Sequence, residues 1–330
     1  MKIDIHTHIM PEKMPNWVKK FGYGEFIHLE HRNCRACMMK GDTLFREVED
    51  NCFLPQVRLK EMDETDVTIQ VLSTIPVLFN YWAKPADSLE TSRFFNDHIG
   101  ETVSGEPSRF IGLGTVPMQD VDLALREMER CMGELQLPGL EIGTNINGKN
   151  LSDPQFLPFF EAAEKLGCSL FIHPWEMMGE SDMQSYWLPW LVGMPAETTR
   201  AICSIIFGGI LEKFPKLRIA FAHGGGSFPY TLGRIEHGYA VRPDLVQIDN
   251  TVNPRDYLGK FWVDSLVHDE KAFSFLRESM TDDKICLGSD YPFPLGEHRP
   301  GELIERLNLD KEPAEKLLYK NAYDWLGLTK

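Results

Sequence analysis

The feature that most constrains the fold of this chain is a short apolar run that recurs eight times along its 330 residues. Segments with helical periodicity separate most of the runs, for example Val121–Leu135, Asp153–Leu166 and Pro195–Phe214. Several runs are almost continuously apolar, as is typical of strands buried on both faces of a parallel sheet. The alternation predicts an α/β fold, specifically a (β/α)8 TIM barrel. The expected strands are Ile3–His8, Val67–Ser73, Phe110–Pro117, Gly139–Thr144, Ser169–Pro174, Arg218–Gly224, Phe261–His268 and Lys284–Tyr291.

Two stretches depart from this alternation. Between Ile9 and Pro55 there is no long helical period, and the segment MMKGDTLFREV predicts a hairpin around Gly41 and Asp42. We therefore expect a small β-rich insertion, at about residues 12–54, over the mouth of the barrel. Residues 300–330 carry one or two helices that we expect to close the barrel and cover its bottom. With no linker or low-complexity tract in sight, the prediction is one domain spanning residues 1–330.

Composition excludes several classes of function. The net charge of −15 and the pI near 5.1 disfavour nucleic acid and anionic membranes as partners. The apolar runs are strand-length, and the N-terminus opens on a strand rather than on the apolar region of a signal peptide. Seven cysteines, an odd number, indicate a reducing cytoplasm rather than a disulfide framework. Cys34 and Cys37 have the spacing of a zinc or redox motif, but no second such pair accompanies them.

Polar side chains with metal-binding chemistry stand at the ends of four expected strands. His6 and His8 end the first, and their spacing places both imidazoles on one face. His173 ends the fifth strand, His223 the sixth and Asp290 the eighth. Barrel enzymes build their sites at this end of the strands, and imidazole with carboxylate suits zinc with an open position for water.

Each of these residues also has a structural interpretation. A single His-x-His pair is weak evidence, and His223 and Asp290 could each be turn residues. Their conjunction at one edge of the barrel decides for a metal site. His268, at the end of the expected seventh strand, is the one partial competitor among the other histidines.

This pattern resembles the amidohydrolase superfamily over the full length of the chain. Many hydrolytic members carry a lysine at the end of the fourth strand that bridges two metals. Here that strand ends in GLEIGTNING, and the nearest lysine is Lys149, so one metal is expected. Longer strings resemble the aminocarboxymuconate-semialdehyde decarboxylases within that superfamily: MKIDIHTHIMP, STIPVLFNYWAKP, YWLPWLVGMPAETT, FAHGGGSFPYTLGRI and LGSDYPFPLGE.

The resemblance implies a zinc-dependent, non-oxidative decarboxylation of 2-amino-3-carboxymuconate 6-semialdehyde to 2-aminomuconate 6-semialdehyde, in tryptophan breakdown. It implies one Zn2+ per chain and a homodimer. The implied zinc ligands are the first-, fifth- and eighth-strand residues His6, His8, His173 and Asp290, with His223 as a catalytic base outside the ligand set.

The resemblance also assigns residues that would bind the substrate. Arg46 looks like a ligand for a substrate carboxylate, and Arg234 like an arginine that crosses the dimer interface into the partner's site. Trp187 and Phe293 look like pocket walls. Position alone would make both arginines surface charges and Trp187 a core residue.

The chemistry of these residues suits a decarboxylation. No lysine signature for PLP and no flavin or thiamine motif is apparent, so the conjugated substrate must itself accept the electron pair that CO2 leaves behind. The alternatives are a decarboxylase of aromatic carboxylic acids, a metal-dependent hydrolase on the same scaffold, and a barrel that has lost activity and serves only to bind.

Overall fold

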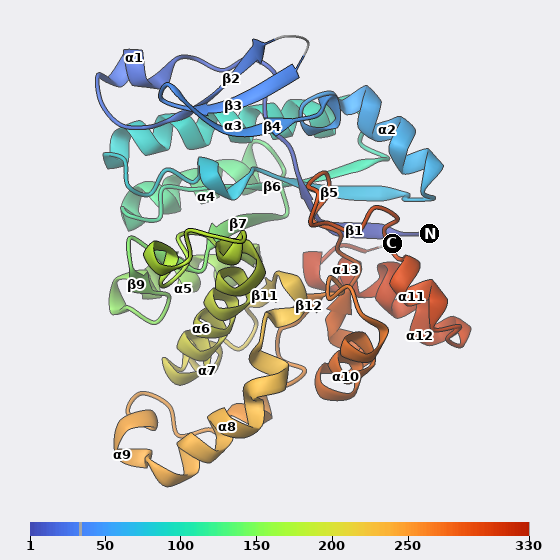
Figure 1. Cartoon of the computed structure of the whole chain (residues 1–330). Helices are drawn as coiled ribbons and strands as arrows, with labels where there is room; N and C mark the ends of the chain where they lie inside the picture. Colours follow the sequence, from blue (N-terminus) through green and yellow to red (C-terminus); the bar gives the residue numbers. More distant parts are fainter. Residues whose placement is uncertain (33–34, 330) are drawn as a thin grey trace.

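Eight parallel strands form a single sheet that closes into a barrel (Figure 1), which confirms the predicted fold class. This computed structural model describes residues 1–32 and 35–329. The backbone N–H groups of Ile5 and His8 donate to the carbonyls of Leu287 and Tyr291 at 2.9 and 2.8 Å, and these bonds join the segment after the last strand to the first strand. In sheet order the strands are β1 (Ile3–His8), β5 (Ile69–Ser73), β6 (Phe110–Gly114), β7 (Gly139–Gly143), β10 (Ser169–His173), β11 (Arg218–Phe221), β12 (Trp262–Asp264) and β13 (Ile285–Cys286).

Helices surround the barrel, and several begin at residues suited to that position. Asp120 accepts from the backbone N–H of Leu123 at 3.0 Å at the start of α4, and Asp269 does the same for α10. The expected helix over Pro195–Phe214 is two helices, because Gly209 adopts a φ of 65° that breaks it. The helices are α1 (Trp17–Phe21), α2 (Pro55–Glu64), α3 (Pro85–Gly105), α4 (Val121–Gly133), α5 (Leu157–Leu166), α6 (Met194–Phe207), α7 (Ile210–Lys213), α8 (Phe228–Val241), α9 (Pro243–Val246), α10 (Glu270–Met280), α11 (Glu302–Arg306), α12 (Lys311–Glu315) and α13 (Asn321–Leu326).

The first strand has the predicted bounds, whereas the other seven are shorter than predicted, the last two most of all. The chain leaves the sheet after Asp264 instead of continuing to His268, and after Cys286 instead of continuing to Tyr291. Asp290 has a φ of 58°, so it lies in a turn beyond β13. Its side chain therefore reaches the barrel mouth from a loop.

The predicted insertion is a three-stranded antiparallel sheet of β2 (Ile27–Arg32), β3 (Arg35–Lys40) and β4 (Thr43–Val48). The hairpin between β3 and β4 turns at Gly41, whose φ is 59°. An apolar cluster that includes Met38, Phe53 and Ile75 fixes this sheet to the barrel. A further antiparallel pair, β8 (Asn145–Ile146) with β9 (Lys149–Asn150), follows β7.

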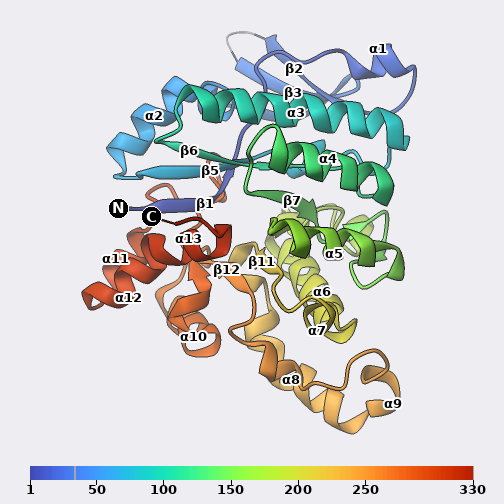
Figure 2. The same cartoon turned by 180° about the vertical axis from the view of Figure 1, so that it is seen from behind.

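The C-terminal helix α13 closes the bottom of the barrel, as predicted. Its Trp325 is fully buried in a cluster with Ile3, Ile5 and Phe171, which point into the barrel. The Ser169 hydroxyl donates to the Trp325 carbonyl at 2.6 Å. Both chain termini lie at this end, beside β1 (Figure 2). Within the described residues no helix combines the length and the apolar character that crossing a membrane requires.

Candidate metal centre and active-site pocket

Four of the predicted residues converge at the barrel mouth. His6 and His8 lie on β1, His173 ends β10, and Asp290 follows β13. All four are buried, and one ligand atom from each lies within 4.8 Å of the others. Spacing on a strand explains the first two, and the closure of the barrel brings β10 and the loop after β13 beside them. The set could hold a metal ion.

Hydrogen bonds fix which nitrogen of each imidazole faces the centre. The Nδ1 of His6 lies 2.7 Å from Oδ2 of Asp264, that of His8 lies 2.8 Å from the Thr74 carbonyl, and that of His173 lies 3.0 Å from the Pro174 carbonyl. Because these acceptors require a proton on Nδ1, each Nε2 carries a lone pair. All three Nε2 atoms are buried and, within the described residues, none makes a hydrogen bond of good geometry. Those of His6 and His8 lie 3.5 and 3.2 Å from Oδ1 of Asp290, the carboxylate that completes the cluster. Lone pairs aimed at one point are the arrangement that a metal ion needs.

The protonation states fit the same purpose. Burial lowers the pKa of His6 and lowers that of His173 further, so both imidazoles are neutral. Burial alone would raise the pKa of the Asp290 carboxyl, but the neighbouring His223, His8 and His6 hold it well below its usual range. Neutral imidazoles and an ionised carboxylate are the forms that bind divalent metals.

His223 lies beside this cluster but outside it. Its ring centroid is 5.1 Å from that of His6 and 5.2 Å from that of His173. Its Nε2 is 3.8 Å from Oδ2 of Asp290. The backbone at His223 has a φ of 57°, a left-handed conformation that is uncommon for a residue with a side chain. This turn places the His223 imidazole beside His6, His173 and Asp290.

A pocket opens above the cluster and encloses about 470 Å³, part of it open to solvent. His8, His173 and Asp290 form part of its wall, whereas His6 and His223 do not line it. Much of the remaining wall is aromatic. The aromatic residues are Phe45, Trp175, Trp187, Trp190 and Phe293.

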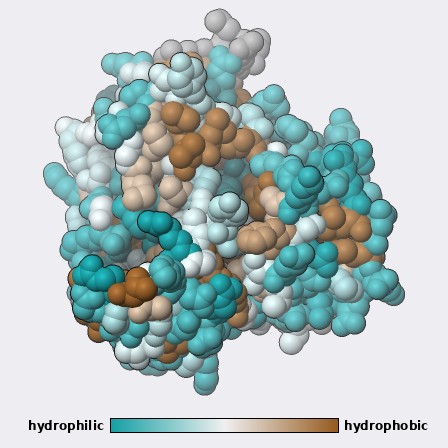
Figure 3. Space-filling model, turned by 60° about the horizontal axis from the view of Figure 1, so that its bottom comes forward, coloured by the Kyte–Doolittle hydropathy of each residue, from teal (hydrophilic) through white to brown (hydrophobic). Residues whose placement is uncertain are grey.

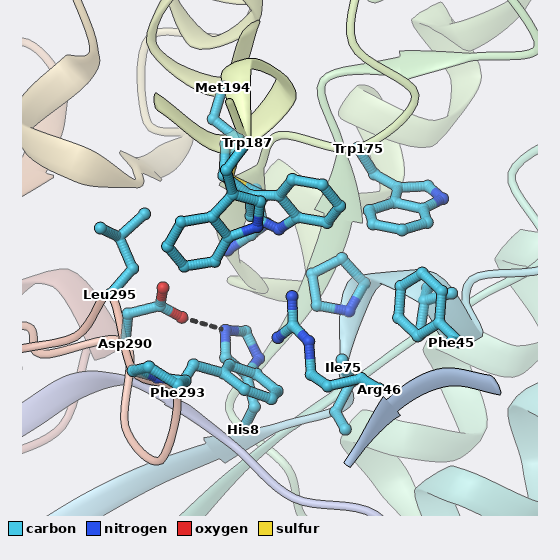
Figure 4. Close-up of a pocket in the computed structure, with 15 residues that line it drawn as sticks. His8, Phe45, Arg46, Ile75, Trp175, Trp187, Met194, Asp290, Phe293 and Leu295 are labelled. Carbon is cyan, nitrogen blue, oxygen red and sulfur yellow. Dashed lines mark ion pairs between the residues drawn. The ribbon is translucent and has the colours of Figure 1, made fainter. Parts of the chain in front are cut away.

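Arg46 brings a positive charge into this pocket. It lies on β4, and Figure 4 shows its guanidinium pointing into the space between His8, Phe293 and Trp187. The guanidinium carbon is 4.8 Å from the ring centroid of Phe293. Burial lowers the pKa of Arg46, and the charge of Asp290 opposes that effect. A desolvated cation of this kind gains from an anionic ligand.

Arg234 is not part of the pocket. It lies on α8 and is exposed to solvent, and it does not line the pocket of its own chain. The structure therefore brings Arg46, Trp187 and Phe293 to the cluster and leaves Arg234 outside. Cys34 lies outside the described residues, and Cys37 is a buried free thiol.

Comparison with known proteins agrees with this arrangement. A family model described as amidohydrolase matches residues 3–328. The chain belongs to the amidohydrolase family. It is 56% identical to a 2-amino-3-carboxymuconate-6-semialdehyde decarboxylase from Dictyostelium discoideum, over 99% of this chain and 92% of that protein. It is 39% identical to a protein of the same description from Caenorhabditis elegans, over 99% of this chain and 94% of that one.

Solved structures show that the fold is shared more widely. The apo form of an IDCase from Metarhizium anisopliae superposes with a TM-score of 0.86 at 20% identity, covering 100% of this chain and 98% of that one. A 5-carboxyvanillate decarboxylase from Novosphingobium aromaticivorans, complexed with manganese and a nitrobenzoic acid, gives 0.81 at 21%, covering 99% and 96%. At these identities the likeness establishes the fold only.

This amidohydrolase chain also has residues at the site that sequence reasoning missed, two behind the histidines and one in the pocket wall. Asp264, at the end of β12, receives the His6 hydrogen bond, and Glu141 on β7 lies 3.7 Å from Nδ1 of His8. Trp175 lines the pocket and follows His173 by two residues, a spacing that could have indicated its place there. The rule that polar residues at strand ends form the site would have found Asp264, had the seventh strand not been extended to His268.

Proposed function

We propose that this protein catalyses the zinc-dependent, non-oxidative decarboxylation of 2-amino-3-carboxymuconate 6-semialdehyde to 2-aminomuconate 6-semialdehyde. The observation that carries the proposal is the half-buried guanidinium of Arg46, held in an aromatic pocket directly above a set of metal-binding side chains. Full-length identities of 56% and 39% to two proteins described as decarboxylases of this substrate support it.

The substrate is a dicarboxylate, and the pocket offers it complementary contacts. Arg46 binds one carboxylate through paired hydrogen bonds, a geometry that lysine cannot reproduce. Trp187 and Phe293 cover the flat conjugated chain and exclude water, which strengthens the charge–charge contacts within the pocket. The protein's net charge of −15 makes this local positive site necessary.

The reaction replaces a carboxyl group by a proton. The carbon that loses CO2 is the β-carbon of an enamine, so it accepts a proton and the neighbouring C–N unit becomes an iminium. The bond to the carboxylate then breaks, CO2 leaves, and the electron pair returns to the carbon skeleton. In this proposal His223 acts as a base that takes a proton from water and then delivers it to this carbon.

We infer one zinc ion per chain, held by His6, His8, His173 and Asp290. When bound, zinc supplies Lewis acidity next to the pocket and favours deprotonation of water at neutral pH. Lys149, the nearest lysine after β7, points away and donates to Gln155 at 2.7 Å on an exposed turn, so it is not available to bridge a second metal. Manganese is the alternative metal, because the 5-carboxyvanillate decarboxylase of the same fold was solved with manganese bound.

We further infer a homodimer in which Arg234 of one chain enters the site of its partner. Helices α8 and α9 extend from the barrel in both Figure 1 and Figure 2, and Arg234 is exposed on α8. Large apolar side chains on the same helix are also exposed, including Tyr230 at 84% and Val241 at 54%. Apolar patches interrupt an otherwise hydrophilic surface in Figure 3. A second chain would cover such side chains.

The compartment proposed for the enzyme is the cytoplasm. The six cysteines of the described residues are all free thiols, and five of them are buried. This fits a reducing environment.

The experiment that tests the function is an assay of purified, zinc-loaded protein on 2-amino-3-carboxymuconate 6-semialdehyde, followed by the loss of the substrate's near-ultraviolet absorbance. Arg46→Lys is the matched variant, because it keeps the positive charge but loses the planar guanidinium that makes paired hydrogen bonds. It should lose most activity. No turnover above the uncatalysed rate, together with turnover of dihydroxybenzoic acids, would establish the aromatic-acid alternative instead.

A further inference from the structure

Asp264 makes four hydrogen bonds at the barrel mouth although it neither lines the pocket nor belongs to the metal-binding set. It is fully buried at the end of β12. Its Oδ2 lies 2.7 Å from Nδ1 of His6 and accepts from the backbone N–H of His223 at 2.8 Å. Its Oδ1 accepts from the backbone N–H groups of Gly224 and Leu266 at 2.8 and 3.0 Å. One carboxylate therefore contacts a metal ligand and the backbone of the proposed base.

The contact with His6 determines which nitrogen of that imidazole is free. A carboxylate oxygen can only accept, so Nδ1 of His6 must carry the proton and donate it. The lone pair is thereby held on Nε2, which faces the other ligands and has no hydrogen-bond partner within the described part of the chain. Carboxylate–histidine contacts of this kind orient metal ligands and raise their basicity.

The contacts with His223 and Gly224 hold an unusual turn. Four consecutive residues, from His223 to Gly226, have positive φ values of 57°, 60°, 75° and 62°. The left-handed conformation is unfavourable at His223, because its Cβ crowds the following carbonyl oxygen. A Cβ on Gly224 would lie 2.5 Å from Cγ1 of Val267, so the turn packs against the loop after β12 too closely for a side chain at this position. Asp264 stabilises this turn by accepting hydrogen bonds from the backbone N–H groups of His223 and Gly224.

We propose that Asp264 is a positioning residue that fixes the metal-binding tautomer of His6 and the orientation of His223 together. The reaction to which this applies rests on the proposed function, whereas the effect on the metal does not. A carboxylate is required, because only two acceptor oxygens can serve all four donors at once. Removing the charge at this one position should weaken both metal binding and proton transfer.

The test is Asp264→Asn, which preserves the shape of the side chain. The amide has one acceptor oxygen, so its NH2 group must face either the N–H groups of His6 Nδ1 and the His223 backbone, or the backbone N–H groups of Gly224 and Leu266. Zinc affinity, measured by competition with a chromophoric chelator, should fall by about 10–100-fold. At saturating zinc, kcat should fall by about tenfold or more while KM changes little, because Asp264 does not touch the substrate.

The matched control is Glu127→Gln. Glu127 is an equally buried carboxylate on α4 that accepts from Arg93, Asn96 and Arg130, away from the pocket. It should lose thermal stability but retain zinc affinity and kcat. If Asp264→Asn behaves like this control, the proposal is wrong and Asp264 is a structural residue only.

A measurement on the unaltered protein covers the case in which Asp264→Asn fails to fold. Long-range 15N–1H spectra of histidine-labelled, metal-free protein report the tautomer of each imidazole, and His6→Gln assigns the signal. We expect the Nδ1–H form for His6, and an Nε2–H form would refute the proposal. Since neither this spectrum nor the chelator competition uses a substrate, both stand even if the decarboxylase assay is negative.

Discussion

At the scale of single residues, the imidazoles at the barrel mouth divide by their contacts. His6, His8 and His173 each donate from Nδ1 and turn Nε2 to a common point. In His223 it is Nδ1 that is buried without a hydrogen-bond partner among the described residues, and it stands outside the group of mutually close ligand atoms. Because His223 lacks the contacts of the other three histidines, we expect its substitution to affect catalysis and theirs to affect metal binding.

His173→Ala should lose most of its bound zinc, because it removes one of three neutral nitrogen ligands from a preformed set. Elemental analysis after zinc loading and gel filtration measures this, with about one zinc per chain expected for the unaltered protein. Two tightly bound metals in the unaltered protein, or full zinc retention in the variant, would contradict the proposed ligand set.

His223→Ala should keep its zinc and lose activity. General acid–base catalysis contributes about 10²–10⁴-fold, so kcat should fall by at least that range. The same zinc analysis, run beside the assay, distinguishes the two roles. Metal content that decreases in proportion to activity would place His223 among the ligands.

His98, on α3, predicts a pH dependence of stability. Burial, and then the charge of Arg58, lowers the pKa of His98 to about 4, and its Nε2 is buried with no partner among the described residues. Its unfolded pKa is near 6.5, so below that pH the unfolded chain binds a proton that the folded protein does not. The stabilisation is complete above pH 6.5 and is lost as the pH falls toward 4.

The expected loss from His98 between pH 8 and pH 5 is about 2 kcal/mol of unfolding free energy. Urea denaturation at a series of pH values measures it. His98→Gln should flatten this part of the pH profile, and an unchanged profile would show that other groups dominate acid unfolding.

At the scale of elements, the two ends of the barrel serve different purposes. The mouth is built from strand ends and the β3–β4 hairpin, which carries Arg46 into the pocket. The bottom is closed by α13, whose Trp325 ring lies 5.9 Å from that of Phe171 between centroids. Since side chains fill the interior between these ends, changes at the bottom should affect stability rather than chemistry.

Trp325→Ala should lower the unfolding free energy by about 3–5 kcal/mol, because it removes a large buried ring and leaves a cavity. Trp325→Phe is the matched variant and should lose clearly less, since the indole N–H it removes has no partner within the described residues. Urea titration followed by circular dichroism measures both. Where Trp325→Ala is folded, zinc content and KM should equal those of the unaltered protein, and a change in either would show that the bottom is coupled to the site.

At the scale of the whole molecule, one chain supplies few positive charges to a dicarboxylate. Arg46 lines the pocket, whereas Arg234 lies exposed on a helix that extends from the barrel. If Arg234 serves the partner's site, each site is made from two chains.

Mixing two inactive variants tests this arrangement. Arg46→Ala and Arg234→Ala homodimers should each be nearly inactive. After subunit exchange at equal amounts, about half of the dimers are mixed, and each has one intact site of two, so activity should recover to about one quarter of the unaltered value. Self-mixing of each variant is the control, and mass-labelled chains demonstrate exchange. Exchange without recovery, or a monomer in sedimentation, would contradict a shared site.

The sequence by itself determined the barrel and the four residues that could hold a metal at its mouth. Strand identity follows from local apolar runs, and β1 has the predicted bounds. The ligands follow from the rule that parallel strands bring their C-terminal ends to one edge, which needs no knowledge of side-chain packing. The expected strand over Lys284–Tyr291 failed at its end, because Asp290 is placed by a turn that has no apolar period.

Only the tertiary structure decided how those residues are held. Asp264 meets His6 across 258 positions of sequence, and the contact exists because β12 and β1 are brought to the same mouth when the sheet closes. The position of Arg46 above the cluster depends on the packing of an inserted sheet whose angle no local pattern encodes. Contacts of this length follow from register and closure, which are properties of the whole barrel rather than of any one segment.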